Sequence, residues 1–322
     1  MKNIFFEFLG RLFFILPKSP KTIQIEITNV CNLNCRMCPR RLLNVEEKHM
    51  NFEVFKKVIN NSKGAKEIIL TGWGEPLSYP YISQAVKYCR ESGFKTRLTT
   101  NGVLLTNELA EKLIAAGLDE ITFSLESLAF DSDDFGHIVK NQAENIENLA
   151  RKKNRPEIII QTTIRKGKEQ DIFELINFAK KINAKSVNLV RIYNKLNPEL
   201  GRPDFKEEKK IVRKAVNFGD KSGVVVSCFQ HSLGRGFFRF IFKIIKSSLH
   251  RKEKFCSKLF TDVYINIKGE LTPCCVLRNY KIGSLLEEPI SDLWENIKFQ
   301  SFRKNWKNVC QKCDAGQISQ IN

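Results

Sequence analysis

The sequence predicts an α/β protein, built as a parallel barrel or a doubly wound parallel sheet and followed by a small cysteine-rich domain. Between Lys21 and Gly223, six short runs rich in Ile, Val, Thr and Leu alternate with longer amphipathic stretches. This alternation is typical of buried parallel strands covered by helices. Beyond Gly223 the alternation stops, and residues 256–322 carry five of the chain's ten cysteines. The change of pattern predicts a domain boundary close to Phe255.

Each strand candidate is a short run of aliphatic and β-branched residues. In chain order they are Thr22–Thr28, Glu67–Thr71, Lys95–Thr99, Glu120–Leu125, Ile158–Ile164 and Ser186–Arg191. The amphipathic stretches predict helices near Phe52–Ser62, Ile82–Ser92, Asn107–Ala116, Asn141–Lys153, Glu169–Ile182 and Phe205–Lys221. Turn residues lie between several of these elements, at Gly64, Gly93, Gly117 and Pro156. Six consecutive strand–helix units predict a parallel sheet.

The chain divides into four predicted segments. They are an amphipathic N-terminal segment (1–20), the strand–helix units (21–223), a basic, Phe-rich amphipathic linker (224–255) and the cysteine-rich domain (256–322). A last strand candidate, Val224–Val226, opens the linker. The cysteine-rich domain contains a β-like run at Asp262–Ile267 and one predicted helix near Ser291–Arg303.

The composition indicates a folded protein with an anionic partner. The 322 residues carry a formal net charge of +18, and 24 phenylalanines stand against six tyrosines and three tryptophans. A hydrophobic content of 42% and a charged content of 27% exclude disordered, collagen-like and coiled-coil proteins. The positive charge makes nucleic acid and a membrane surface the first two candidate partners.

The N-terminal residues contain no recognisable secretory signal. Met1–Pro17 is apolar, but Glu7 and Arg11 interrupt it and no small-residue cleavage site follows. The stretch is also shorter than the roughly 20 apolar residues that span a bilayer. We therefore expect a cytoplasmic protein, in which clustered cysteines stay reduced and bind a metal or a cluster.

Three cysteines follow the first predicted strand directly. Cys31, Cys35 and Cys38 have the pattern C-x3-C-x2-C, and no further cysteine occurs before Cys89. Thiolates select zinc or iron–sulfur clusters, and a structural zinc site requires a fourth ligand nearby. Three cysteines on one loop instead suit a 4Fe–4S cluster with one iron left open for a small molecule. A zinc knuckle remains the alternative.

With this triplet the sequence resembles the radical S-adenosylmethionine (SAM) enzymes, whose signature is a cysteine triplet after the first strand. A second motif, Thr71-Gly72-Trp73-Gly74-Glu75-Pro76, ends the second strand. It resembles the family's Gly-Glu-Pro segment, which contacts the SAM amino group, and the resemblance assigns Gly72, Gly74, Glu75 and Pro76 to SAM. Two glycines and a proline let a backbone turn tightly against a ligand, and Glu75 offers an acceptor for an ammonium. A plain turn is the alternative.

Two further strand ends carry weaker motifs of the same family. Thr99-Thr100-Asn101-Gly102 is similar to its Thr-Asn-Gly turn, although Asn-Gly is a common turn dipeptide. Ser124-Leu125-Glu126-Ser127 is similar to a Ser-x-Asp segment that binds the ribose and methionine ends of SAM. The resemblance therefore assigns Asn101, Ser124 and Glu126 to SAM, although Glu126 is one methylene longer than the usual aspartate. Met37 stands where the family more often has an aromatic residue.

The cysteine-rich domain predicts a second site. Cys256, Cys274, Cys310 and Cys313 supply four thiolates, two of them on a C-x2-C turn, which suits a closed four-ligand site. The spacing Cys256-x12-Gly269-x4-Cys274 resembles the short "twitch" form of the SPASM auxiliary domain, which implies one auxiliary 4Fe–4S cluster. Tetrahedral zinc is the alternative. Cys275 either exchanges roles with Cys274 or is a spare.

Two segments have an apolar face opposite a charged or polar one. In Gly234–Lys254, cations recur at spacings of three and four residues, while Phe and Ile occupy the other helical face. Met1–Pro17 carries a similar apolar stripe. Such helices either lie in a membrane interface or pack on the barrel, and the sequence leaves both readings open. Nucleic-acid binding is not expected, because the aromatics share a stripe with aliphatics and do not alternate with cations.

The resemblance implies a partial (β/α)6 TIM-like barrel with its active site at the carboxyl ends of the strands. It also implies reductive cleavage of SAM to a 5′-deoxyadenosyl radical, which abstracts hydrogen from a substrate. The basic surface suits docking of an acidic flavodoxin or ferredoxin as electron donor. The substrate classes are a small molecule, a sugar or a lipid-linked compound, in a net oxidation assisted by the auxiliary cluster. A SPASM-type peptide maturase and a non-catalytic iron–sulfur or zinc binding module are the alternatives.

Overall fold

The computed structural model describes residues 17–35, 37–38, 40, 46–128, 136–192, 201–228, 231, 256–310 and 313, with the side chains of 136–139 and 257 excepted. In this part of the chain, ten strands form one sheet in the order β10-β9-β8-β1-β2-β3-β4-β5-β6-β7. The strands are β1 (Thr22–Ile25), β2 (Glu67–Leu70), β3 (Lys95–Thr100), β4 (Glu120–Ser124), β5 (Glu157–Ile164), β6 (Ser186–Arg191), β7 (Val225–Cys228), β8 (Asp262–Ile265), β9 (Glu270–Thr272) and β10 (Gly283–Ser284).

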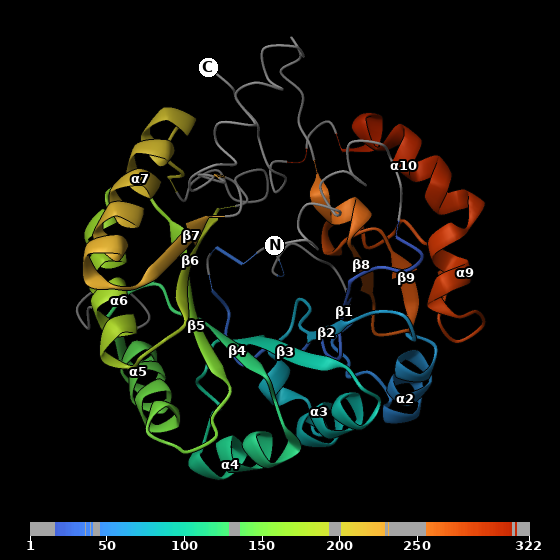
Figure 1. The fold of residues 1–322 in the computed structure, drawn as a ribbon, viewed down its shortest axis with the longest axis horizontal. Coiled ribbons are helices and arrows are strands. Elements are labelled where there is room, and N and C mark those ends of the chain that lie inside the picture. The colour runs from blue at the N-terminus through green and yellow to red at the C-terminus, as the bar shows by residue number, and fades with distance from the viewer. Residues whose placement is uncertain are drawn as a thin grey trace.

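Helices alternate with the parallel strands β1 to β7, and two further helices follow β10 in the described part of the chain. They are α2 (Phe52–Asn60), α3 (Ile82–Glu91), α4 (Asn107–Ala116), α5 (Gly136–Ala150), α6 (Glu169–Lys181), α7 (Phe205–Ser222), α9 (Ile290–Glu295) and α10 (Ile297–Val309), with short 3₁₀ turns η2 (Pro76–Ser78), η6 (Ser257–Phe260) and η7 (Cys275–Leu277). Strands β1 to β7 are all parallel to their neighbours, and α2 to α7 form an arc outside the curved sheet (Figure 1). This arrangement confirms the predicted α/β class and the predicted partial barrel.

The two faces of the curved sheet differ in chemistry because successive side chains of a strand point to opposite sides. Ile23 and Ile25 of β1 are fully buried in the core that the outer helices cover. Gln24 therefore lies on the concave face, and it is in register with Tyr264 of β8. At the amino ends of the strands, this concave face is charged, since Arg97 bonds Glu120 at 2.5 Å across β3 and β4. Polar groups therefore line the inside of the partial barrel.

Strand β1 ends at Ile25, three residues before the predicted end. Glu26 N still donates to Ile265 O of β8 at 2.8 Å, but beyond Glu26 the chain has other partners: Ile27 O accepts from Met50 N at 2.8 Å, and Thr28 forms an antiparallel bridge with His49. Thr28 O also accepts from Gly74 N at 3.3 Å. The loop after β2 therefore crosses the extension of β1, and this crossing brings the glycine motif next to the cysteine triplet.

The strands of the cysteine-rich domain extend the barrel sheet. β8 pairs in parallel with β1, and β9 and β10 then add antiparallel strands. The predicted helix at Ser291–Arg303 is two helices, because Asn296 has an extended ψ of 140° and its side chain accepts from Lys298 N, which starts α10. The Arg303 guanidinium lies 3.9 Å from the ring centre of Trp294, so a cation–π contact holds the two helices together.

Several predictions concern residues outside the described part. Gly234–Lys254 and residues 1–16 of the Met1–Pro17 segment belong to this group, as do most residues of the 224–255 linker. Among the helices that the structure describes, none has the length and apolarity to cross a membrane. The four-segment division and its boundary near Phe255 stay predictions.

Candidate active site and cysteine clusters

The predicted site residues of the barrel gather at the carboxyl ends of successive strands. The cysteine triplet follows β1, the glycine motif follows β2, Asn101 follows β3, and Ser124 is the last residue of β4. In a parallel barrel these ends lie at one rim, where active sites form. The sequence order of the motifs is therefore also their spatial order around the rim.

The triplet loop holds its three thiols half-buried and near one another. Cys38 N donates to Cys35 O at 3.0 Å, which folds the C-x2-C part into a turn. Burial, together with charges on Cys38 and Cys31, raises the pKa of the Cys35 thiol to about 11. Burial likewise raises the pKa of Cys31. Since cluster ligands must be thiolates, a bound cationic iron centre would relieve this mutual repulsion, and the donor set fits a three-ligand 4Fe–4S cluster.

The two glycines of the second motif make close contacts with the polypeptide itself. A Cβ atom on Gly74 would lie 2.5 Å from Val30 O and 2.6 Å from Thr28 O. A Cβ atom on Gly72 would lie 2.4 Å from Cγ of Glu26. Among the described residues, both glycines approach the extension of β1. The glycines therefore fix the motif against the base of the cysteine loop. The predicted approach of their backbone to a ligand stays a prediction.

Glu75 is buried, with 3% of its surface exposed, and three protein groups donate to its carboxylate. They are Leu77 N at 2.9 Å, Thr100 Oγ1 at 2.6 Å and Asn101 N at 2.8 Å. Burial raises the pKa of Glu75, and these hydrogen bonds oppose that shift. A carboxylate has about four acceptor positions, so one remains for an ammonium. Pro76 begins the 3₁₀ turn η2, which Glu75 caps.

Asn101 connects three parts of the rim. Its side-chain amide donates to Asn32 Oδ1 at 2.8 Å, inside the cysteine loop. Its own side-chain oxygen accepts from Val103 N at 2.9 Å, and its carbonyl accepts from Gln142 of α5 at 2.7 Å. The structure thus places Asn101 as a link between the loop after β3 and the triplet.

Glu126 lies on the loop after β4, the strand next to β3. Its carboxylate accepts from Thr163 N at 3.0 Å and from Thr163 Oγ1 at 2.5 Å, at the end of β5. The charge of Glu126 also adds to the raised pKa of the Cys35 thiol. Met37 also reaches Thr163, with its sulfur 3.7 Å from Thr163 Oγ1.

The second cysteine group forms in the tail. Burial raises the pKa of Cys274 to about 12 and that of Cys310 to about 11, and neighbouring cysteines add to both shifts. Cys256 is among the neighbours of both residues, and Cys313 N donates to Cys310 O at 3.0 Å. The thiols therefore suit a shared iron–sulfur centre by the same argument as the triplet. In the described ranges, no three His, Cys, Asp or Glu side chains are arranged to hold a single metal ion.

The remaining cysteines separate by environment. Cys275 is half-buried, and burial raises the pKa of its thiol, with the nearby charge of Lys258 opposing the shift and those of Glu26 and Cys313 adding to it. It therefore lies between the second cysteine group and the barrel. Cys89 is fully buried in the core on α3, and Cys228 ends β7 with 5% exposure.

Sequence reasoning missed Glu26, Trp73 and Arg278, which meet at this junction. Glu26 is fully buried, accepts from Trp73 N at 3.2 Å and pairs with Arg278 at 3.3 Å. The available signal was weak, because Glu26 shares the polar face of the alternating stretch Ile23–Ile27 with Gln24 and only its burial calls for a charged partner. Arg278 had no comparable signal, because it lies in a loop 252 residues away.

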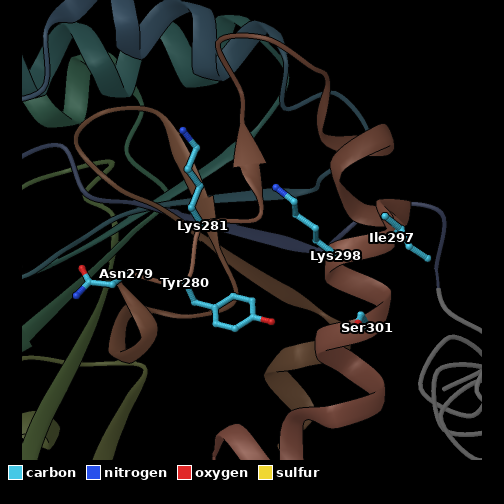
Figure 2. A pocket seen from close by; sticks show the side chains of 6 residues that line it. All are labelled: Asn279, Tyr280, Lys281, Ile297, Lys298 and Ser301. Atoms are coloured by element: carbon cyan, nitrogen blue, oxygen red, sulfur yellow. The ribbon is translucent and has the colours of Figure 1, made fainter.

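A surface hollow of about 450 Å³ lies away from these motifs. It is lined by Asn279, Tyr280, Lys281, Ile297, Lys298 and Ser301 (Figure 2). Its walls are the segment before β10 and one side of α10, as the close view shows. Ile297 is 75% exposed, and Lys281 pairs with Glu270 at 2.9 Å. The hollow brings no predicted site residue into contact.

Comparisons with known proteins agree with this geometry. The model of the radical SAM superfamily matches residues 25–194, which is more than half of the chain, and the model of the SPASM iron–sulfur cluster-binding domain matches residues 256–314. A "tungsten-containing aldehyde ferredoxin oxidoreductase cofactor-modifying protein" of Pyrococcus furiosus is 25% identical over 91% of this chain and 87% of its own length. An "AdoMet-dependent heme synthase" of Methanosarcina barkeri is 26% identical over 94% of this chain and 91% of its own.

Solved structures share the fold at lower identity. Streptococcus suis SuiB bound to the precursor peptide SuiA superposes with a TM-score of 0.70 at 17% identity, covering 94% of this chain and 71% of SuiB. The protein anSMEcpe with bound AdoMet superposes with a TM-score of 0.64 at 20% identity, covering 91% of this chain and 86% of anSMEcpe. The two matched domains imply a 4Fe–4S cluster, an auxiliary cluster and SAM as cofactors. The chain belongs to the radical SAM superfamily and carries a SPASM iron–sulfur domain at its C-terminal end.

Proposed function

We propose that this enzyme activates a small-molecule substrate by abstracting a hydrogen atom at the rim of the barrel. Cys31, Cys35 and Cys38 would hold the cluster with the open iron, and Cys256, Cys274, Cys310 and Cys313 would hold the auxiliary cluster. The observation that supports this most is the convergence of the cysteine triplet, the glycine motif and Asn101 at one rim. When bound, the open-site cluster supplies the electron that cleaves SAM to methionine and a 5′-deoxyadenosyl radical.

The residues of the rim hold SAM in place for this chemistry. Gly72 and Gly74 bring backbone groups next to the triplet, and Glu75 offers its remaining acceptor position to the SAM ammonium. Asn101 fixes the cysteine loop through Asn32, so the loop and the SAM-binding backbone keep one geometry. Such fixed positions account for much of the rate that an enzyme gains from proximity and orientation. Ser124 and Glu126 complete the proposed SAM contacts.

The relatives favour a non-peptide substrate. The two relatives described above, which match over nine-tenths of this chain, are named for the modification of an enzyme cofactor and for heme synthesis. SuiB, whose structure contains a precursor peptide, shares the fold at 17% identity, which carries no argument about substrate. We therefore place a small molecule ahead of a sugar, a lipid-linked compound and a peptide. A net oxidation assisted by the auxiliary cluster, a flavodoxin or ferredoxin donor, a cytoplasmic location and membrane-surface contact stay predictions.

The first test measures 5′-deoxyadenosine after anaerobic reconstitution with iron and sulfide, followed by SAM and a reductant. The wild-type chain should form it, and Cys31→Ala, Cys35→Ala and Cys38→Ala should abolish it. Cys89→Ala is the matched control, because Cys89 is a core residue of α3, and this variant should retain formation. If the cluster on Cys31, Cys35 and Cys38 is intact and the protein forms no 5′-deoxyadenosine, the proposal is contradicted.

A further inference from the structure

A set of buried contacts joins the glycine motif to the auxiliary cysteine turn. The carboxylate of Glu26 accepts from Trp73 N on one oxygen at 3.2 Å and from Arg278 Nη2 on the other at 3.3 Å. The Trp73 indole Nε1 donates to the carbonyl of Cys275 at 3.2 Å. We call Glu26, Trp73, Cys275 and Arg278 the Glu26 bridge. Each end of the bridge lies in a loop that carries proposed cofactor contacts.

The bridge is rigid at the barrel end. Glu26 is fully buried, and the backbone of Gly72 lies so close to it that a Cβ atom there would overlap its side chain. Burial raises the pKa of Glu26, and the charge of Arg278 opposes this shift. Removing Arg278 would leave an uncompensated buried carboxylate, which is strongly unfavourable. The position of Trp73 and Gly72 therefore depends on where Arg278 lies.

At the other end, the bridge depends on a turn that begins at a proposed cluster ligand. Cys275 and Arg278 lie one and four residues after Cys274, and Leu277 N donates to Cys274 O at 3.1 Å across the turn. Among the described residues, Arg278 Nη1 is buried without a hydrogen-bond partner, so the guanidinium is held on the Glu26 side through Nη2. Ligation of Cys274 would fix the start of the turn that carries Arg278.

We infer that loading of the auxiliary site strengthens SAM binding through the Glu26 bridge, with Trp73 and Arg278 as positioning residues. The inference rests on the proposed function, which assigns Gly72–Pro76 to SAM and Cys274 to the auxiliary cluster. A ligated Cys274 fixes the turn, the turn fixes Trp73 and Glu26, and these fix the backbone that SAM meets. Linkage makes the effect reciprocal, so bound SAM also favours the loaded auxiliary site.

The test measures the Kd of SAM by equilibrium dialysis with labelled SAM, on anaerobically reconstituted protein of known iron content. Cys313→Ala empties the auxiliary site without changing a bridge residue, and Trp73→Phe keeps the ring but removes the indole N–H. We expect each to weaken SAM binding about 5- to 20-fold, a usual range for coupling between sites. The double variant should bind SAM no more weakly than the single variant with the lower affinity, because both changes act through one bridge.

Trp294→Phe is the matched control. Its indole N–H also donates to a backbone carbonyl, that of Pro17 at 2.7 Å, but it lies on α9 outside the bridge. This variant should bind SAM as the wild type does. Equal SAM affinity in Cys313→Ala, with loss of the auxiliary iron shown by analysis, would overturn the inference alone, as would additive effects in the double variant. No SAM binding by the fully loaded wild type would overturn the proposed function and the inference together.

Discussion

Gly74 lies where the loop after β2 crosses the extension of β1, and the atoms around it belong to the backbone. A Cβ atom would meet Val30 O at 2.5 Å and Thr28 O at 2.6 Å, and neither carbonyl can move without shifting the cysteine loop. Gly74→Ala should therefore lower the thermal midpoint by overpacking and weaken SAM binding. Both are measurable on the reconstituted protein by thermal unfolding and equilibrium dialysis.

Gly223→Ala is the control for this prediction. Gly223 caps α7 with a φ of +76°, and a Cβ atom there would meet open space. Alanine should cost about 1 kcal/mol of stability through the left-handed backbone alone and leave SAM affinity unchanged. Equal SAM affinity in Gly74→Ala and the wild type would contradict the assigned role of the crossing.

Some features of the site can be predicted from neighbouring residues in the sequence, and others depend on contacts between distant residues. The triplet, the glycine motif and the C-x2-C pair are short spacings on one loop, so the sequence alone predicts them. The pairing of Glu26 with Arg278 has no such local signal, because the two residues come into contact only when the fold places β1 beside the turn after Cys274. The reason for the two glycines was likewise hidden, because the atoms that exclude a Cβ atom, on Glu26 for Gly72 and on Thr28 and Val30 for Gly74, come from the segment after β1.

At the scale of elements, α7 is held to β6 by a buried group of three charged or ionisable residues. Glu208 on α7 accepts from Arg191 Nε at 2.9 Å and Nη2 at 2.6 Å, and it also bonds His231. Burial opposes ionisation of Glu208, but the hydrogen bonds from His231 and Arg191 outweigh it and lower its pKa below 4.5. The stabilisation is therefore present above the unfolded-state pKa and is lost as the pH falls through the lower folded-state value.

Glu208→Gln should destabilise the protein by about 3 kcal/mol near neutral pH, because it leaves the buried Arg191 without its anion. Thermal midpoints of the variant and the wild type, measured from pH 7 downwards, should converge below pH 4.5 as Glu208 of the wild type becomes protonated. Glu207→Gln on the same helix turn is the control and should cost less than about 1 kcal/mol. A constant gap between Glu208→Gln and the wild type at all pH values would refute the ionic origin of the effect.

Periodicity predicted the elements of the barrel closely because each strand and helix buries one regular face. The helices α2, α3, α4, α6 and α7 begin at the predicted residue. Prediction was poorer where a single polar residue interrupts an amphipathic run, as at Asn296, whose side chain ends one helix pattern and caps the next. The end of β1 was missed for another reason, since the partners of the chain beyond Glu26 come from the loops at Lys48–Met50 and Gly74.

At the scale of the whole molecule, one sheet runs through the barrel and the SPASM domain. Strand β8 pairs with β1 over four residues, from Thr22 with Asp262 to Ile25 with Ile265. Local patterns could indicate that Asp262–Ile267 is a strand, but not that its partner is the first strand of the chain. The domain that brings the second cysteine group therefore also completes the edge of the barrel.

Truncation after residue 255 should consequently damage the barrel as well as remove the auxiliary site. The shortened chain would expose the β1 edge, with its unpaired backbone groups, and such edges promote association between chains. We expect size-exclusion chromatography to show aggregates in place of the species formed by the full chain. A truncated chain that elutes without aggregates and holds an intact cluster on Cys31, Cys35 and Cys38 would show that β8 is dispensable for the barrel.

The pairing of β1 with β8 has a consequence for synthesis of the chain. β8 begins roughly 240 residues after β1. At about 5–20 residues per second, the ribosome needs about 10–50 seconds to deliver the partner of a strand made near the start. Throughout that interval the nascent barrel has an open edge, and its cysteine triplet lies beside it. Cooling slows translation and so lengthens this interval. Chaperones that shield exposed strands should therefore raise the yield of folded protein more than cooling does.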